Sequence, residues 1–281
     1  MRLVGITRHP VKSLQGEQIG SATIETDGLV GDRCWGIRDE TTGKILTGRR
    51  APELLFASAA LAPDGSPVIT LPTGETCHGP GPDTDASLSR WLAKPVRLVR
   101  SVGAPGARAE FFADATDDAS EAVEWTMPAG RFVDALPLLV LTTASLRTAE
   151  ALHPDGDWHL RRFRANLVVD VEGSGWGEDD WYAASDLRIG DVRLRPEQGC
   201  VRCTMVTRTQ PGLAEDRDIF RTLARHHGAL FGAWSTVVTS GTVHLGDEVA
   251  VQPRSDRPPA VDSLVIAQRR SDDDPRPVDI A

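Results

Sequence analysis

The stretch DLRIGDVRLRP, residues 186–196, is the clearest indication of the fold class. Its apolar residues alternate with polar ones on both sides of Gly190-Asp191, and a Gly-Asp pair between two such runs is typical of antiparallel strands joined by a tight turn. Residues 242–253, TVHLGDEVAVQP, have the same arrangement. We therefore expect both segments to be hairpins of a mainly β protein with few helices.

The first hundred residues repeat this pattern of short strands and turns. Ile19, Ala22 and Ile24 alternate with polar residues, and Asp-Gly and Thr-Gly pairs separate the apolar runs at 21–47 and 57–74. Antiparallel hairpins are the usual outcome of such a sequence. Residues 101–125 are richer in Ala, Asp and Glu, so we interpret them as a connecting segment that contains a subdomain boundary.

Three segments have helical patterns. One lies near 85–96, with Asp85 or Ser87 as its cap and Pro95 as its stop. Another begins near Ser145 and follows a buried strand at 135–143; it has Leu146 and Leu152 on its apolar side. The third lies within 215–232, where Ile219, Leu223 and the helix-ending Gly228 fit one amphipathic helix.

Composition limits the partners and the location. A net charge of −9 and a pI near 5.3 argue against general affinity for nucleic acid or anionic membranes, which are polyanions. The start, MRLVGITRHPVKS, lacks the apolar core of a signal peptide, and no later run is long and apolar enough to span a bilayer. Four cysteines are too few for a disulfide framework. We expect a cytoplasmic protein.

The segment PEQGCVRCTMVTRT, residues 196–209, contains two thiols three residues apart, with Arg202 between them. Zinc would require four ligands, and no second cysteine pair is present. A redox pair would begin a helix, whereas Val201, Thr204 and Val206 favour an extended chain. A single reactive thiolate beside Arg202 is a third interpretation. Two buried, inert cysteines are a fourth, because free cysteine is usually buried.

Polar clusters elsewhere offer donors that suit a phosphate. They are Lys12-Ser13, Arg33, residues 47–50, and Arg164 with Asn166. Each alone is more often a solvated surface than a site. Together they supply the forked and point-charge donors that bind phosphate, in a chain whose overall charge would repel one.

The ordered segments VKS, GDRCW, FRAN, CVRC and LFGAWSTVVTSGTVHLGDEV resemble the MOSC family, and the arrangement is similar to the mitochondrial amidoxime-reducing component and its bacterial relatives. The resemblance implies an N-terminal β-barrel subdomain at 1–110, a MOSC β-barrel domain at 111–253 and a mostly disordered tail at 254–281. It also implies a molybdenum–pterin cofactor bound in the crevice between the two subdomains. The metal ligand and catalytic residue would be Cys203. The implied cofactor contacts are Lys12, Ser13, Arg33, Thr143, Ser145, Arg164, Asn166 and Arg202.

The same resemblance implies the reduction of a small N-hydroxylated substrate, with oxygen leaving through molybdenum. No dinucleotide fingerprint or iron–sulfur cysteine set is present, so we expect electrons from a flavin reductase, ferredoxin or haem protein. The chain has Thr209 and Gln210 where relatives usually have Asp-Pro. That departure favours the alternative of a non-catalytic cofactor or sulfur carrier.

Overall fold

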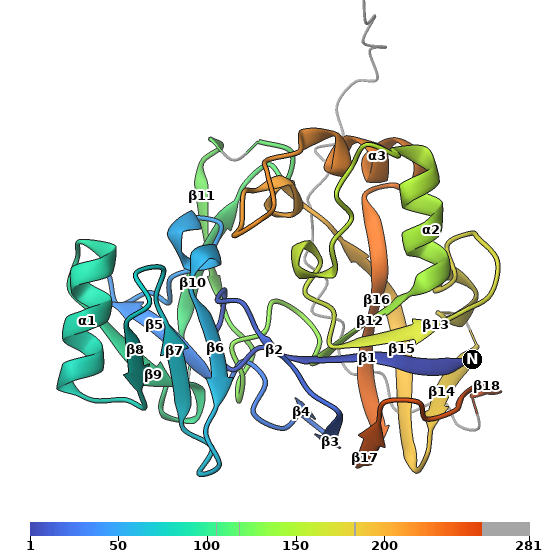
Figure 1. Ribbon diagram of the computed structural model, residues 1–281, viewed down its shortest axis with the longest axis horizontal. Coiled ribbons are helices and arrows are strands. Elements are labelled where there is room, and N and C mark those ends of the chain that lie inside the picture. The colour runs from blue at the N-terminus through green and yellow to red at the C-terminus, as the bar shows by residue number, and fades with distance from the viewer. Residues whose placement is uncertain (105, 118, 183, 255–281) are drawn as a thin grey trace, which may run out of the picture.

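The largest unit of the protein is an eight-stranded, curled sheet. The computed structural model describes residues 1–104, 106–117, 119–182 and 184–254. Figure 1 shows this sheet on the right, and its strand order is β18-β14-β15-β16-β12-β13-β1-β2. All neighbouring pairs are antiparallel except β12 and β13, which are parallel. The strands are β1 (Arg2–Arg8), β2 (Glu17–Gln18), β12 (Leu138–Thr142), β13 (Leu167–Asp170), β14 (Ser185–Ile189), β15 (Val192–Val201), β16 (Leu230–Thr239) and β18 (Val249–Pro253).

Strand β12 is buried on both faces, as its continuous apolar sequence predicts. Leu138 and Val140 pack into the core inside the curled sheet. Leu139 and Leu141 pack on the opposite face, against residues of helices α2 (Thr143–Leu152) and α3 (Arg217–His227). The sheet therefore separates two apolar cores.

A second lobe lies on the left of Figure 1 and consists of smaller sheets with helix α1 (Pro82–Leu92). These sheets are β5-β9, β6-β7-β8 and the hairpin β10-β11. A separate apolar core fills this lobe. Its strands are β5 (Trp35–Asp39), β6 (Ser58–Leu61), β7 (Pro67–Thr70), β8 (Thr76–His78), β9 (Val96–Arg100), β10 (Arg108–Phe112) and β11 (Ala122–Thr126).

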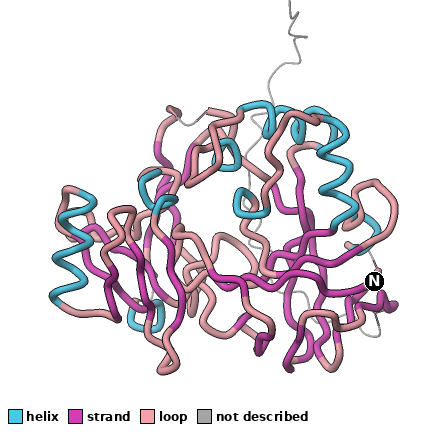
Figure 2. Tube along the Cα trace, in the orientation of Figure 1, coloured by secondary structure: helices cyan, strands magenta, loops and turns pink. Residues whose placement is uncertain are grey.

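The start of the chain belongs to the large sheet. Strand β1 pairs with β13, more than 150 residues later in the sequence, and β3 (Ser21–Glu25) lies between β4 (Gly28–Leu29) and β17 (Gly241–His244). Ala22, Ile24 and Leu29 consequently pack into the core inside that sheet. Long loops joining these elements are visible between the lobes (Figure 2). The domain boundary at residue 110 stays a prediction.

Most predicted elements are present, with corrections at several of them. The 186–196 hairpin is confirmed as β14-β15, whereas the two strands of 242–253 diverge: β17 pairs with β3 and β18 with β14. Residues 101–125 are not a mere connection, because they contain β10 and most of β11. Helix α3 is confirmed: Ile219 and Leu223 are buried, and Gly228 caps its C-terminus in the left-handed region.

Two predicted helices differ in their details. Helix α1 begins at Pro82, three residues before the predicted cap Asp85, which instead accepts a hydrogen bond from the Leu98 amide. Pro at the first helical position needs no amide partner. Leu152 is 40% exposed, so its predicted place on the apolar side of α2 is wrong. Residues 255–281, where most of the predicted tail lies, are outside the described residues.

Candidate functional site

Lys12 lies in the turn that follows β1, with its side chain buried. Its amide donates to the Trp35 carbonyl, which fixes the turn against β5. Its ammonium group donates to the Phe132 carbonyl at 2.9 Å and to Asp134 Oδ1 at 2.6 Å. Burial lowers the pKa of Lys12 from 10.5 to about 8; Asp134 opposes this shift, and Arg49 and Arg33 add to it. Lys12 is thus a cation that titrates near neutral pH.

Asp134 holds a second cation next to Lys12. Its Oδ2 atom accepts from Arg49 Nη2 at 2.9 Å. Burial alone would raise the pKa of Asp134, but the charges of Arg49 and Lys12 outweigh it and hold that pKa well below the ordinary value. The carboxylate therefore stays ionised and keeps two cationic side chains together.

Cys203 lies two residues after the end of β15, just before the short 3-10 turn Thr204–Thr207, and is partly accessible. Arg49 lies close enough to interact electrostatically with its sulfur. Burial lowers the pKa of Arg49, but its interactions with Asp134 and Cys203 outweigh burial and hold that pKa above the ordinary value. We call Lys12, Arg49, Asp134 and Cys203 the Cys203 cluster. It joins the two lobes, because Arg49 comes from one and Cys203 from the other.

Backbone contacts hold the Cys203 segment in place. The Thr204 amide donates to the Ala115 carbonyl at 3.0 Å, and Arg208 Nη1 donates to the Gly48 carbonyl at 2.9 Å. The Gly48 amide in turn donates to the Ser13 hydroxyl at 2.9 Å. Ser13 and Arg208 therefore connect the loop of Arg49 to the loops of Lys12 and Cys203.

A second basic group contains Arg33, Arg164 and Asn166. Arg33 donates to Asn166 Oδ1 and to the Arg164 carbonyl, each at 3.3 Å, and also contacts Asp32. Burial, together with the charge of Arg33, lowers the pKa of Arg164 to about 9. Asn166 is buried and also bonds the Leu139 amide and the Thr7 carbonyl, so it ties β12 to β1.

Three of the residues in these loops have left-handed backbones: Ser13 (φ 69°), Arg33 (φ 51°) and Arg164 (φ 56°). Non-glycine residues rarely adopt this conformation, and strain of this kind gathers at functional sites. Only Ala93 and Ala229 share it among the non-glycine residues that the structure describes.

Two domain families match the chain. The MOSC N-terminal beta barrel domain matches residues 1–115, and the MOSC domain matches residues 129–250. The chain belongs to the MOSC family. Mitochondrial amidoxime-reducing component 1 of Mus musculus is 27% identical, over 86% of this chain and 79% of that protein. Molybdenum cofactor sulfurase of Danio rerio is 26% identical, over 76% of this chain but 29% of that protein.

The solved structure of the YuaD protein from Bacillus subtilis is also similar to this MOSC chain. It has a TM-score of 0.46 and 12% identity, over 90% of this chain and 96% of that one. A search of the described residues found no helix that is both long and apolar enough to cross a membrane.

The guanidinium of Arg202 does not face the Cys203 cluster of this MOSC chain. It is buried and donates to the carbonyls of Phe231 and Phe163, with its Cζ atom 5.7 Å from the Phe163 ring centroid. These contacts fix the backbone that precedes Cys203. Arg202 therefore supports the loop through its interior contacts.

Thr143 and Ser145 lie at the opposite end of β12 from Asp134. The Ser145 hydroxyl is buried and bonds Glu178, while the Thr143 hydroxyl donates to Asp170 Oδ1 at 2.7 Å. Both hydroxyls stabilise the start of helix α2 and its surroundings. The structure does not bring them together with the Cys203 cluster.

Cys200 differs from Cys203 although only two residues separate them. It is buried in the core beneath α3, and burial raises the pKa of its thiol to about 11. At neutral pH Cys200 is a protonated, inert thiol. No group of three or more His, Cys, Asp or Glu side chains suited to a metal occurs within the described part of the chain.

The sequence interpretation missed Asp134 and did not select Arg49 from its basic cluster at 47–50. Asp134 stands alone in VDALP and carries no motif. The only signal for Arg49 was that a Thr-Gly turn precedes it in a β-rich segment. Their pairing is a tertiary contact 85 residues apart in sequence, which periodicity cannot reveal.

Proposed function

We propose that this chain binds a molybdenum–pterin cofactor through Cys203 and reduces small N-hydroxylated molecules with electrons from a separate donor protein. The observation that carries the proposal is the Cys203 cluster. It combines one partly accessible thiol, an arginine that interacts with its sulfur and a buried lysine whose pKa is about 8. The names of the relatives supply the substrate class and the metal.

The residues of the cluster fit such a cofactor. A pterin dithiolene and oxo groups fill most of the metal's coordination sphere, so a single protein thiolate is sufficient. Lys12, Arg33 and Arg164 would hold the terminal phosphate with charge-assisted hydrogen bonds, helped by Ser13 and Asn166. Arg49 would hold the thiolate in place, and Arg202 would position the loop. When bound, the cofactor would supply the two-electron redox chemistry and take up the substrate's oxygen.

Asp134 has a distinct role in this proposal. It holds Lys12 and Arg49 together, so the site is pre-organised without a ligand. Pre-organisation removes part of the cost of ordering side chains during binding. An incoming phosphate would compete with Asp134 for Lys12, and Arg49 would retain its bond to the carboxylate.

The electron donor is proposed to be a separate protein. The amidoxime-reducing relatives suggest this arrangement, and no dinucleotide-binding motif is evident in the sequence. The chain carries a net charge of −9, so docking to a basic surface of a donor would weaken with increasing salt.

The test begins with protein purified from a host that makes the cofactor. Elemental analysis and pterin fluorescence measure whether molybdenum and pterin are bound in equal amounts. The loaded protein is then given a model hydroxylamine with NADH, first alone and next with a flavin reductase and a carrier. We expect turnover only in the second mixture. Absence of molybdenum would refute the cofactor, and turnover in the first mixture would refute the need for a donor.

The second candidate is a carrier of the cofactor or of sulfur. Thr209 and Gln210 stand where relatives usually have Asp-Pro, and neither side chain has a carboxylate. Gln210 is buried, and its backbone pairs with Leu213. The similarity to molybdenum cofactor sulfurase points the same way. A turnover assay with a chemical reductant distinguishes the two: a carrier would transfer its cofactor to an apo-enzyme and show no sustained cycling.

A further inference from the structure

A partly enclosed cavity of about 290 Å³ lies between the start of the chain and the segment before β13. Its wall includes His9, Gln15, Arg161, Arg164 and Gln210. Arg164 is the only one of its lining residues that the proposed cofactor site also uses. The cavity is close to the lower limit of typical small-molecule sites, so it has room for a small organic molecule.

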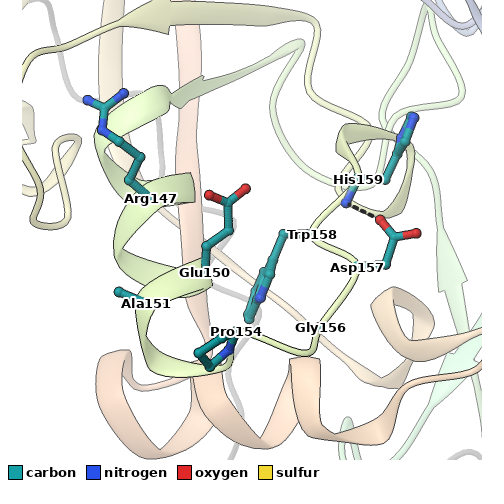
Figure 3. A pocket seen from close by; sticks show the side chains of 8 residues that line it. All are labelled: Arg147, Glu150, Ala151, Pro154, Gly156, Asp157, Trp158 and His159. Carbon is teal, nitrogen blue, oxygen red and sulfur yellow. Dashed lines mark hydrogen bonds between the residues drawn. The ribbon is translucent and has the colours of Figure 1, made fainter.

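A larger hollow of about 740 Å³ lies at the end of α2, but it is less suited to a ligand. Figure 3 shows its side chains, with Glu150 and Asp157 beside Arg147 and His159. Asp157 already accepts from the His159 amide. Arg147 already donates to the Gly173 and Val171 carbonyls, and two carboxylates line the hollow, so nothing there favours one kind of ligand.

His9 is the decisive residue of the smaller cavity. It is 3% exposed, and neither ring nitrogen has a hydrogen-bond partner within the described part of the protein. Burial and the charges of Arg164 and Arg33 lower its pKa well below the ordinary value, so the ring is neutral with one donor and one acceptor. Buried polar atoms are rarely left without a partner, because each unpaired group costs free energy. His9 is part of the cavity wall, next to a space that can hold a partner for its ring.

Gly16 leaves room for the His9 ring beside the cavity. Gly16 lies against the ring, and a Cβ atom at this position would be 2.6 Å from His9 Nδ1 and 2.3 Å from the Arg8 carbonyl oxygen. Any larger residue would have to displace the ring or the backbone. Because Gly16 has no side chain, the imidazole of His9 can pack against its backbone and form part of the cavity wall.

The charge of the lining is positive. Arg161 donates to Gln15 Oε1 at 3.2 Å and to the Pro211 carbonyl at 2.8 Å, while its buried Nε atom has no partner among the described residues. Arg164 donates to the Leu14 carbonyl at 2.6 Å. No carboxylate lines the cavity, so the positive charge of these two arginines is not neutralised in its wall. A bound anion would neutralise part of this positive charge.

We propose that this cavity binds a small molecule through a carboxylate or phosphate group, held by Arg161, Arg164 and His9. The arginines would supply charge-assisted donors and His9 a neutral one. Lys12, Arg49 and Cys203 do not line the cavity, and Arg164 is the one residue that it shares with the proposed cofactor site. The inference therefore applies first to cofactor-free protein, in which Arg164 is available to the anion.

The test follows the His9 ring nitrogens by NMR while inorganic phosphate or acetate is added to the full chain in a buffer free of other oxyanions. The His9→Gln variant assigns the signals. We expect saturable shifts of the His9 signals with both anions. Arg161→Met should weaken binding by about tenfold or more, the effect of one lost charge-assisted hydrogen bond. Arg147→Met, a matched change at an exposed arginine, should not.

A second pair of variants keeps the test valid if Arg161→Met fails to fold. Gln210→Glu places a carboxylate in the cavity and should abolish the shifts, whereas Gln198→Glu on the exposed face of β15 should leave them unchanged. The proposal is overturned if neither anion shifts the His9 signals, or if Lys12→Met abolishes the shifts as Arg161→Met does. It is also overturned if loading with cofactor abolishes them, because the cavity would then hold the cofactor's own phosphate.

Discussion

The surroundings of Cys203 and those of Cys200 contain the same residue types with opposite consequences. Cys203 is partly accessible and interacts with Arg49, a cation that is held by a carboxylate in a loop. Cys200 is buried, and its neighbour Arg202 donates to backbone carbonyls in the interior. The comparison teaches that a thiol and an arginine adjacent in sequence do not make a reactive pair. What matters is whether the guanidinium already donates its hydrogen bonds to carbonyls in the protein interior.

The largest expected effect is at the thiols. Cys203→Ser should lower molybdenum-dependent turnover by more than ~100-fold, beyond the 10–100-fold typical of groups that only support a ligand. The oxygen ligand is harder than sulfur and changes the electronics of the metal. Cys200→Ser, the matched control, should have a much milder effect on turnover. Steady-state kinetics with a chemical reductant, normalised to bound molybdenum, measure both. The reverse order of effects would mean that the ligand is Cys200.

The next effect is at the two cations held by Asp134. Lys12→Met or Arg49→Met should each weaken cofactor binding by about tenfold or more, since a hydrogen bond to a charged group contributes about 1.5–3 kcal/mol. Fluorescence titration of the apo-protein with isolated cofactor measures this affinity. Arg50→Met, at the partly exposed neighbouring residue, is the control. Equal losses in Arg50→Met and Arg49→Met would contradict the special position of Arg49.

The pH dependence of cofactor binding should depend on Lys12. Its pKa in the free protein is about 8, and an anionic ligand stabilises the charged form and raises that pKa. Affinity should therefore be constant below pH 8 and fall as pH rises above it, by at most about tenfold per pH unit for one proton. Lys12→Arg should remove this fall above pH 8. An unchanged profile in Lys12→Arg would assign the titration to another group, such as Arg164.

The smallest effect on binding is expected at Arg202. Arg202→Lys cannot reproduce the bonds to Phe231 and Phe163, so the free energy of unfolding should fall by about 1–3 kcal/mol. Cofactor affinity of the folded fraction should change less than in Arg49→Lys. Chemical denaturation and fluorescence titration measure the two quantities separately. A larger loss of affinity than in Arg49→Lys would show that Arg202 contacts the cofactor directly.

Some features of the molecule were predictable from local sequence and others were not. The β14-β15 hairpin and helix α3 follow from Gly190-Asp191 and Gly228, because turns and caps are local. The separation of β17 from β18 was not predictable, since each pairs with a strand far away in the chain.

The basic cluster at 47–50 was evident, but the pairing of Arg49 with Asp134 depends on how the lobes meet. The left-handed conformations of Arg33 and Arg164 have no sequence signal, because these residues are not glycines. The cytoplasmic location stays a prediction.

The pairing of β1 with β13 also affects how the chain matures during synthesis. The first strand leaves the ribosome early but has no neighbour on its β13 side until residue 170 has followed it. Contacts so distant in sequence form late and slowly, because the intervening loop must close first. The Lys12 loop directly follows this strand, and its ammonium group bonds Phe132 and Asp134, which lie 120 and 122 residues later in the sequence. Any insertion of a cofactor beside Lys12 is then a late event, after most of the chain is already synthesised.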